Sequence, residues 1–239
     1  MQNYKIGQTG YPEKCNICVK EGTKAELFKG GLELSVRPFW KGNNPKVMLV
    51  GLNPTLANKQ VRTVFDLDNK DSQIFKYISH DILEPTRIKL NEHIYATNLV
   101  KCTFPYKQEP RVICEKSSGK KDNQTVKKFL SPFFQNCKKY FKEEINQINP
   151  KVVISFGEVP HQLIVEEFDL QSQKVDKDMK KAFSNIYRVN ILDRELLYVP
   201  CIRLKVKRRA YFRDLWDVFV KRLQEAIIYA GISIKEEYP

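Results

Sequence analysis

The chain has 239 residues, which fits one large domain, and its 42% of hydrophobic residues excludes global disorder. No apolar run approaches the roughly 20 residues that cross a membrane, and residues 1–10 lack the apolar stretch of a signal peptide, so we expect a cytoplasmic protein. Lysine and arginine number 41 against 28 acidic residues, for a net charge of +13. This excess suits a polyanionic partner such as nucleic acid, although charge alone names no reaction.

Four short apolar runs, rich in β-branched residues and bounded by turn residues, predict buried strands of a parallel sheet. They cover residues 46–50, 93–97, 151–155 and 195–199. Helical patterns follow at residues 71–83, 126–148, 159–168 and 210–230. The alternation predicts a single α/β domain over residues 1–239, a three-layer α/β/α sandwich with a central, mainly parallel four-stranded sheet. A polar, lysine-rich insertion at about 106–124 is expected to be mobile.

Ligands of such sheets bind beyond the carboxyl ends of the strands. The loop after the first strand reads Gly51-Leu52-Asn53-Pro54, in which the glycine permits a sharp turn and the proline stiffens the chain. The amide of Asn53 both donates and accepts hydrogen bonds at the mouth of the sheet. Taken alone, this fragment is explained more simply by an ordinary strand-to-helix turn.

Six cysteines in a cytoplasmic chain favour metal binding, redox chemistry or burial over a disulfide framework. Cys15 and Cys18 form a C-x-x-C pair, which can hold one metal centre. Zinc or a redox pair would explain this pair equally well. The remaining cysteines are scattered, at Cys102, Cys114, Cys137 and Cys201.

Three motifs occur in order along the chain: G-x-N-P at residues 51–54, T-N-x-V-K-C-x-x-P at 97–105 and I-x-P-K-V-V-I-x-x-G at 148–157. Together they resemble the uracil-DNA glycosylase superfamily, and the resemblance covers roughly residues 15–216. The G-x-N-P loop is similar to the water-binding motif of the mismatch-specific and single-strand-selective branches, whereas the T-N-x-V-K-C stretch is similar to the iron–sulfur branch. The resemblance implies a DNA glycosylase that hydrolyses the N-glycosidic bond of a flipped-out uracil or other deaminated or modified base and leaves an abasic site.

The resemblance also assigns residues to roles. Asn98 matches the asparagine whose amide reads the edge of the base, with a buried asparagine that caps the strand end as the alternative. Asn53 would orient a water molecule beside the sugar, and Gly51 and Leu52 would shape the pocket. Phe65 stands near the place where the family stacks an aromatic ring on the base, with Phe75 and Phe104 as alternatives.

One departure from the family follows the fourth strand. The family usually has His-Pro-Ser there, whereas this chain reads Val199-Pro200-Cys201, and valine donates nothing to a departing base. We expect Val199 to line the base pocket, which would then admit a base bulkier than uracil. We expect Arg203 to be the nearest donor, and we interpret all three histidines, His80, His93 and His161, as structural. The basic run continues with candidate phosphate contacts, although such runs are usually solvated faces: Lys205, Lys207, Arg208 and Arg209.

The resemblance further implies that a [4Fe–4S] cluster is held by Cys15, Cys18, Cys102 and Cys137. Tetrahedral zinc remains the chemical alternative, and Cys114 competes for the fourth position. Other functions stay open: an inactive DNA-binding protein of the same fold, a glycosylase for a bulky modified base of foreign DNA, or a redox protein. No G-x-x-x-x-G-K-[ST] motif occurs, so no nucleotide cofactor is expected, and we expect a monomer that binds single- or double-stranded DNA.

Overall fold

The computed structural model describes residues 36–53, 63–104, 110–118, 122–207 and 209–232. Within them lies a six-stranded sheet with the strand order β1-β3-β2-β4-β6-β5. The strands are β1 Phe39–Trp40, β2 Val47–Gly51, β3 Ile94–Asn98, β4 Val152–Phe156, β5 Tyr187–Ile191 and β6 Arg194–Cys201. The four predicted strands are the central ones, β3, β2, β4 and β6, and each is parallel to its neighbours in that set. The predicted α/β sandwich is confirmed.

The sheet has six strands where the sequence predicted four. The additional strands β1 and β5 lie at the two edges, and both run antiparallel to their neighbours. β5 and β6 form a hairpin whose turn residues, Leu192 and Asp193, have φ angles of 53° and 60°. Two consecutive left-handed residues make a tight hairpin turn that matches the twist of the strands. The Leu192-Asp193 pair is not the usual Asn-Gly sequence of such turns, so the sequence pattern did not predict this hairpin.

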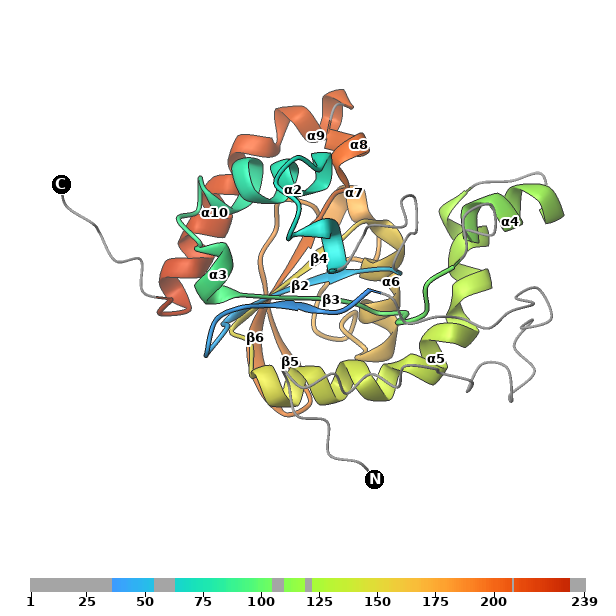
Figure 1. Cartoon of the computed structure of the whole chain (residues 1–239), viewed down its shortest axis with the longest axis horizontal. Coiled ribbons are helices and arrows are strands. Elements are labelled where there is room, and N and C mark those ends of the chain that lie inside the picture. Colours follow the sequence, from blue (N-terminus) through green and yellow to red (C-terminus); the bar gives the residue numbers. More distant parts are fainter. Residues whose placement is uncertain (1–35, 54–62, 105–109, 119–121, 208, 233–239) are drawn as a thin grey trace.

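Helices cover both faces of the sheet (Figure 1). One core lies between the sheet and α5 Asn123–Ile148 and α6 Glu158–Glu167. The other lies between the sheet and α2 Gln73–Ile78, its π-helical continuation Ser79–Leu83, and α10 Trp216–Tyr229. The shorter helices are the 3-10 turn η2 Val64–Asp66, α3 Leu90–His93, α7 Met179–Ala182, α8 Leu204–Lys207 and α9 Ala210–Asp214. Each predicted helix corresponds to one of these elements or to two in succession.

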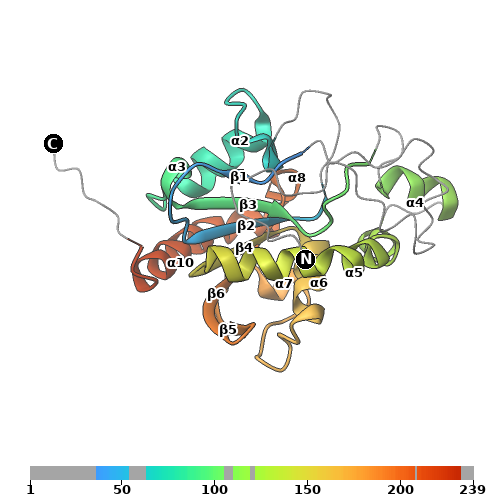
Figure 2. The same ribbon diagram turned by 60° about the horizontal axis from the view of Figure 1, so that its bottom comes forward.

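The expected insertion contains regular structure. Helix α4 covers Pro110–Ser118, and α5 begins inside the insertion at Asn123 because the Asp122 carboxylate caps it by accepting a hydrogen bond from the Thr125 N–H at 2.8 Å. Figures 1 and 2 show α4 standing away from the sheet beside the first turns of α5. Across the described part of the chain, no helix combines the length and apolar character needed to cross a bilayer.

His161 is a structural residue of this fold, as predicted. It lies fully buried on α6, where its Nε2 donates to the Asp176 carbonyl at 2.8 Å and its Nδ1 accepts from the Tyr198 hydroxyl at 2.9 Å. The Tyr198 oxygen also lies 2.8 Å from the Ser155 hydroxyl. Burial lowers the pKa of His161 to about 4, against the opposing effect of the Asp176 carbonyl. The imidazole is therefore neutral in the folded protein at neutral pH.

This buried histidine predicts a loss of stability in mild acid. Between pH 6.5 and about 4 the unfolded chain binds a proton at His161 that the folded chain does not, so acid favours unfolding. From pH 7.5 to 4.5 we expect this group to remove about 2–3 kcal/mol from the free energy of unfolding. Urea unfolding at both pH values measures this loss. The variant His161→Gln, although less stable overall, should show a correspondingly smaller pH dependence, and an identical dependence would contradict the assignment.

Candidate active site

The carboxyl ends of the parallel strands meet at one edge of the sheet. In the strand register Gly51 pairs with Asn98, and Phe156 pairs with Cys201 one strand further along. Because side chains alternate between the two faces of a sheet, Asn98 and Cys201 both point toward the face covered by α2 and α10. These positions form the floor of the candidate site.

Asn98 lies directly over Gly51. A β-carbon on Gly51 would lie only 2.2 Å from Asn98 Oδ1, so no residue with a side chain fits there without displacing the amide. Asn98 is only 5% exposed, yet its side-chain amide makes no hydrogen bond within the part of the chain that the structure describes. An amide at the edge of the sheet that is not bonded within the described residues is suited to bind a ligand.

Phe65 lies beside this pair of residues. Its ring lies 3.0 Å from the same β-carbon position on Gly51 and packs edge-on against Phe156, with ring centroids 5.1 Å apart. The backbone of Phe65 is left-handed, with φ of 59°, which is costly for a bulky residue. The two alternative rings lie elsewhere: Phe104 is buried against Phe133, and Phe75 lies against His80. Strain of this kind persists where the surrounding structure enforces it, often at functional sites.

The loop after β3 is tied to the loop after β2. The N–H of Leu99 donates to the Gly51 carbonyl at 2.9 Å, and the N–H of Val100 donates to the Leu52 carbonyl at 2.8 Å. Leu52 is buried, and the next residue, Asn53, is partly buried at the edge of the sheet. The predicted residues Gly51, Leu52, Asn53 and Asn98 are therefore brought together by backbone pairing alone.

Arg203 approaches the same edge from the end of β6. Its side chain lies over Gly157, where a β-carbon would be 2.6 Å from Arg203 Nε and where φ is 98°. Burial, together with the positive charge of Arg111 and against the opposing effect of Glu158, lowers the pKa of Arg203 to about 10. The guanidinium is still charged at neutral pH, and it has no hydrogen-bond or ion-pair partner among the described residues.

Val199 lies within strand β6 and not at its carboxyl end. It is fully buried inside β6, paired with Ile154 and two residues before the end of the strand. The residue that shares a row and a face with Asn98 is Cys201, which the sequence suggested as a buried or pocket residue and which is fully buried. Tyr77, which the sequence did not assign to the site, donates its hydroxyl to the Ile202 carbonyl at 2.7 Å and lies 3.6 Å from Cys201 Sγ. Burial raises the pKa of Cys201 to about 12, so this thiol is neutral.

The basic run after β6 divides into two kinds of residue. Lys207 forms a salt bridge with Asp81 at 2.8 Å and lies 4.3 Å above the ring of Trp216, so it joins α8 to the π-helical segment Ser79–Leu83 and to α10. Lys205 and Arg209 are exposed. Arg208 lies outside the described residues.

Of the two predicted metal ligands that the structure describes, Cys137 belongs to α5 and Cys102 to a segment that contacts this helix. The segment 101–104 runs along this helix: its first residue bonds Glu144, and its last packs on Phe133 with ring centroids 5.4 Å apart. Cys137 lies between these two points and shares the face of Phe133, four residues earlier. Cys102 and Cys137 are both buried, with 1% and 2% of their surface exposed.

Cys114 is placed away from this pair. Its thiol lies 3.7 Å from the carbonyl of Thr125 in the first turn of α5. Thr125 precedes Cys137 by about 18 Å along the helix axis. Cys15 and Cys18 lie outside the described residues, and the described part alone contains no group of three or more histidine, cysteine or acidic side chains that could hold a metal.

Comparison with known proteins gives one family. The model described as the uracil DNA glycosylase superfamily matches residues 39–219. No curated protein matches the chain. The matched span includes every described residue at the edge of the sheet, from Gly51 to Arg203.

The contact between Gly51 and Asn98 predicts different outcomes for two glycine substitutions. In Gly51→Ala the new methyl group meets a side-chain amide, which can rotate away, so the protein should stay folded with Asn98 displaced. In Gly42→Ala, remote from the site, the methyl group would lie 2.3 Å from the backbone oxygen of Glu92, which cannot move freely. We expect Gly42→Ala to lose about 1–3 kcal/mol in urea unfolding and Gly51→Ala to lose less. Side-chain amide NMR signals of Asn98 should shift only in Gly51→Ala, and unchanged signals there would refute the contact.

Proposed function

The chain belongs to the uracil DNA glycosylase superfamily, and we propose that it hydrolyses the N-glycosidic bond of a uracil or another deaminated or modified base in DNA, leaving an abasic site. The observation that carries this proposal is the amide of Asn98, unbonded within the described residues, over Gly51 with the ring of Phe65 beside it. An amide offers one donor and one acceptor, which complement the edge of a uracil, and an aromatic ring offers a surface for stacking.

The target base must leave the DNA stack to reach these residues. Asn98 then binds the edge of the base, and Phe65 covers its face. Gly51 lacks a side chain, and this leaves room for the amide and the ring to meet at one point. The rigid backbone pairing of the loops after β2 and β3 holds this geometry before the substrate arrives, which reduces the cost of ordering it during the reaction.

Cleavage develops positive charge on the sugar and negative charge on the leaving base. Asn53 follows Gly51 and Leu52, whose carbonyls accept hydrogen bonds from the loop after β3, so its amide is held near the same edge. An amide does not titrate usefully, so Asn53 orients the attacking water molecule and does not act as a strong base. A fixed dipole beside the oxocarbenium-like sugar also stabilises its charge without reorganisation.

The leaving base needs a donor other than histidine. The three histidines of the chain lie elsewhere: His80 pairs with Glu84, His93 precedes β3, and His161 is buried on α6. Cys201 occupies the row of Asn98 as a neutral thiol, which is a weak donor. We assign leaving-group stabilisation to Arg203, since its charged guanidinium lies at the end of the same strand and is unpaired within the described residues.

This arrangement bears on the choice of base. On the side toward β6, the row of Asn98 continues with Phe156 and Cys201, which are buried and apolar or weakly polar. A site without a strong donor on this side suits a base that leaves easily or one bulkier than uracil, including a modified base of foreign DNA. The same weak donor set also favours the second candidate function, a DNA-binding protein of this fold with little or no catalysis.

The DNA backbone would bind along the strand ends and the basic run. Lys205 and Arg209 are exposed there, whereas the charge of Lys207 is already engaged by Asp81. We therefore assign phosphate contacts to Lys205 and Arg209, and leave Arg208 as a prediction from the sequence. Contacts of this kind make affinity fall steeply with salt concentration.

We also propose the [4Fe–4S] cluster, with Cys102, Cys137, Cys15 and Cys18 as ligands. The burial of Cys102 and Cys137, one on a segment that contacts α5 and one on α5 itself, is compatible with this set, and the position of Cys114 against Thr125 in the first turn of α5 favours Cys137 for the fourth place. Thiolate sulfur is the donor that iron–sulfur clusters take, and zinc is the alternative. A cluster at this point would hold the loop after β3 against α5.

The proposal predicts base release that depends on two asparagines. Oligonucleotides that each carry one altered base (uracil, hypoxanthine, xanthine or a bulky cytosine derivative) are incubated with the protein and then cleaved with alkali at abasic sites. On the substrate base, Asn53→Ala and Asn98→Ala should each lower kcat by about 10²–10³-fold, as the loss of a fixed dipole at the reacting centre does elsewhere.

Asn190→Ala is the matched control, because Asn190 lies on the edge strand β5, with its side chain exposed and away from the ends of the central strands. It should cleave like the unaltered protein. Binding of DNA without cleavage of any base, and with no effect of either asparagine, would instead establish the DNA-binding function.

A separate prediction concerns iron. Protein purified without air should contain about four iron atoms and absorb broadly near 400 nm. Cys102→Ser and Cys137→Ser should lose iron, whereas Cys114→Ser and Cys201→Ser should keep it. If the purified protein contains zinc and no iron, the site is a zinc site and not a cluster. If it contains neither metal and its thiols oxidise reversibly, a redox pair is favoured.

A further inference from the structure

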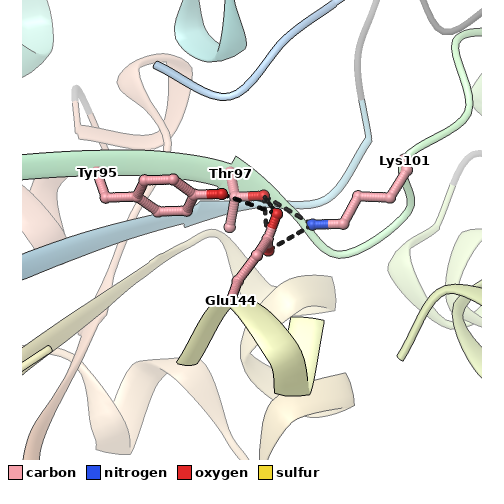
Figure 3. Close-up of polar contacts among 4 residues, drawn as sticks. All are labelled: Tyr95, Thr97, Lys101 and Glu144. Carbon is pink, nitrogen blue, oxygen red and sulfur yellow. Dashed lines mark hydrogen bonds and ion pairs between the residues drawn. The ribbon is translucent and has the colours of Figure 1, made fainter. Parts of the chain in front are cut away.

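A buried ion pair lies beneath the base-reading residue. Lys101 Nζ is 2.6 Å from Glu144 Oε2 on α5, and both side chains are less than 10% exposed (Figure 3). Thr97 joins the pair, since its hydroxyl donates to the Glu144 carboxylate at 3.0 Å and its oxygen accepts from Lys101 at 2.7 Å. Tyr95 adds a fourth contact by donating to Glu144 Oε1 at 2.9 Å.

These contacts close a short loop of chain. Thr97 and Lys101 are four residues apart, and their side chains meet on the face of the sheet toward α5. Asn98 follows Thr97 and points to the opposite face. On the other side of the same segment, Leu99 and Val100 donate their N–H groups to Gly51 and Leu52. The segment that presents Asn98 is thus fixed by side chains at its ends and by backbone bonds in its middle.

Stabilisation of the fold does not by itself explain a buried ion pair of this kind. The free energy lost when two charges are removed from water offsets much of the attraction between them. Well-packed apolar residues therefore often stabilise a protein as much as a buried ion pair does. Buried polar networks that are fully bonded do fix one geometry, because each alternative arrangement leaves a group unpaired. Thr97 in particular uses its donor and its acceptor at once, which only a hydroxyl allows.

We propose that Thr97, Lys101 and Glu144 form a positioning device that holds the Asn98 amide at the place where it reads the base. The inference rests on the proposed function, in which Asn98 binds the base edge. None of the three residues touches the substrate. They act through the backbone of residues 97–101, and they distinguish one base from another only through the placement of Asn98.

The test uses variants of the full-length protein. Thr97→Val keeps the shape and the strand preference of the side chain and removes both hydrogen bonds, whereas Thr97→Ser retains them. The double variant Lys101→Met with Glu144→Leu removes both charges together, so no uncompensated charge is left buried. It provides a second folded variant in case Thr97→Val does not fold. The matched control is Thr86→Val, which deletes an equally buried hydroxyl that bonds the carbonyls of Ile82 and Leu83, away from the site.

The first readout needs no catalysis. Amide hydrogen exchange is followed at Leu99 and Val100, whose N–H groups bond to Gly51 and Leu52. Both amides should exchange at least about tenfold faster in Thr97→Val and in the double variant, because the segment opens locally more often. Exchange there should be unchanged in Thr97→Ser and in Thr86→Val. Unchanged exchange in Thr97→Val and in the double variant would overturn the proposal.

The other readout is kcat/KM for the base that the protein releases, with affinity for unaltered DNA measured in parallel. Thr97→Val and the double variant should lose about 10–100-fold in kcat/KM, as a small misplacement of a reacting group does, while affinity for unaltered DNA changes less than about twofold. Full activity in both variants would also overturn the proposal. If no base is released even by the unaltered protein, the proposed function fails, and the exchange experiment still decides whether the segment is held in this way.

Discussion

The parallel register of the four central strands is the constraint on which the site depends. Because β3, β2, β4 and β6 run in one direction, the loops that follow them all emerge at the same edge. Pairing of Gly51 with Asn98 then brings the two loops within backbone hydrogen-bonding distance, and Leu99 and Val100 continue the ladder past the end of the strand. A glycine is required at position 51, because any side chain there would enter the space of the Asn98 amide and the Phe65 ring.

Polar groups in the interior follow two patterns, and the contrast identifies the site. Glu144, Lys101 and Thr97 are buried with bonding partners on every side, and so are His161, Tyr198 and Ser155 on the same face of the sheet. Asn98 and Arg203, at the carboxyl edge, have no such partners within the described residues. Paired groups hold the fold in one geometry, whereas donors and acceptors without a partner at the mouth of a parallel sheet are available to a bound substrate.

The sequence predicted the elements that short-range patterns determine. Runs such as 46–50 and 151–155 are continuously apolar and β-branched, so they are recognisable as buried parallel strands without knowledge of their neighbours. The loops after them could be identified for the same reason, and Gly51, Asn98 and Phe65 do lie together at the edge of the sheet. The β5–β6 hairpin was missed because its left-handed turn is made by Leu192 and Asp193, which carry no turn signal.

Features that depend on distant pairing could not be predicted. Val199 was assigned to the pocket by motif position, and this assignment stays a prediction; the register of β6 against β4 shows that Cys201 is the residue in the row of Asn98. Lys207 belongs to a basic run in the sequence, and only the fold shows that Asp81 neutralises it. Glu144 is one charged residue among many on α5, and its role emerges only when α5 packs beneath Lys101 and Thr97.

The central claim is that Asn98 and Phe65 bind a base that has left the DNA stack. The most direct test is a crystal structure of Asn53→Ala bound to an oligonucleotide with a deoxyuridine analogue whose 2′-fluorine slows cleavage. We expect a flipped base with its edge bonded to the Asn98 amide, its face on the Phe65 ring, and Arg203 near its far oxygen. A base that stays stacked in the DNA, or one bound away from Gly51, would contradict this claim.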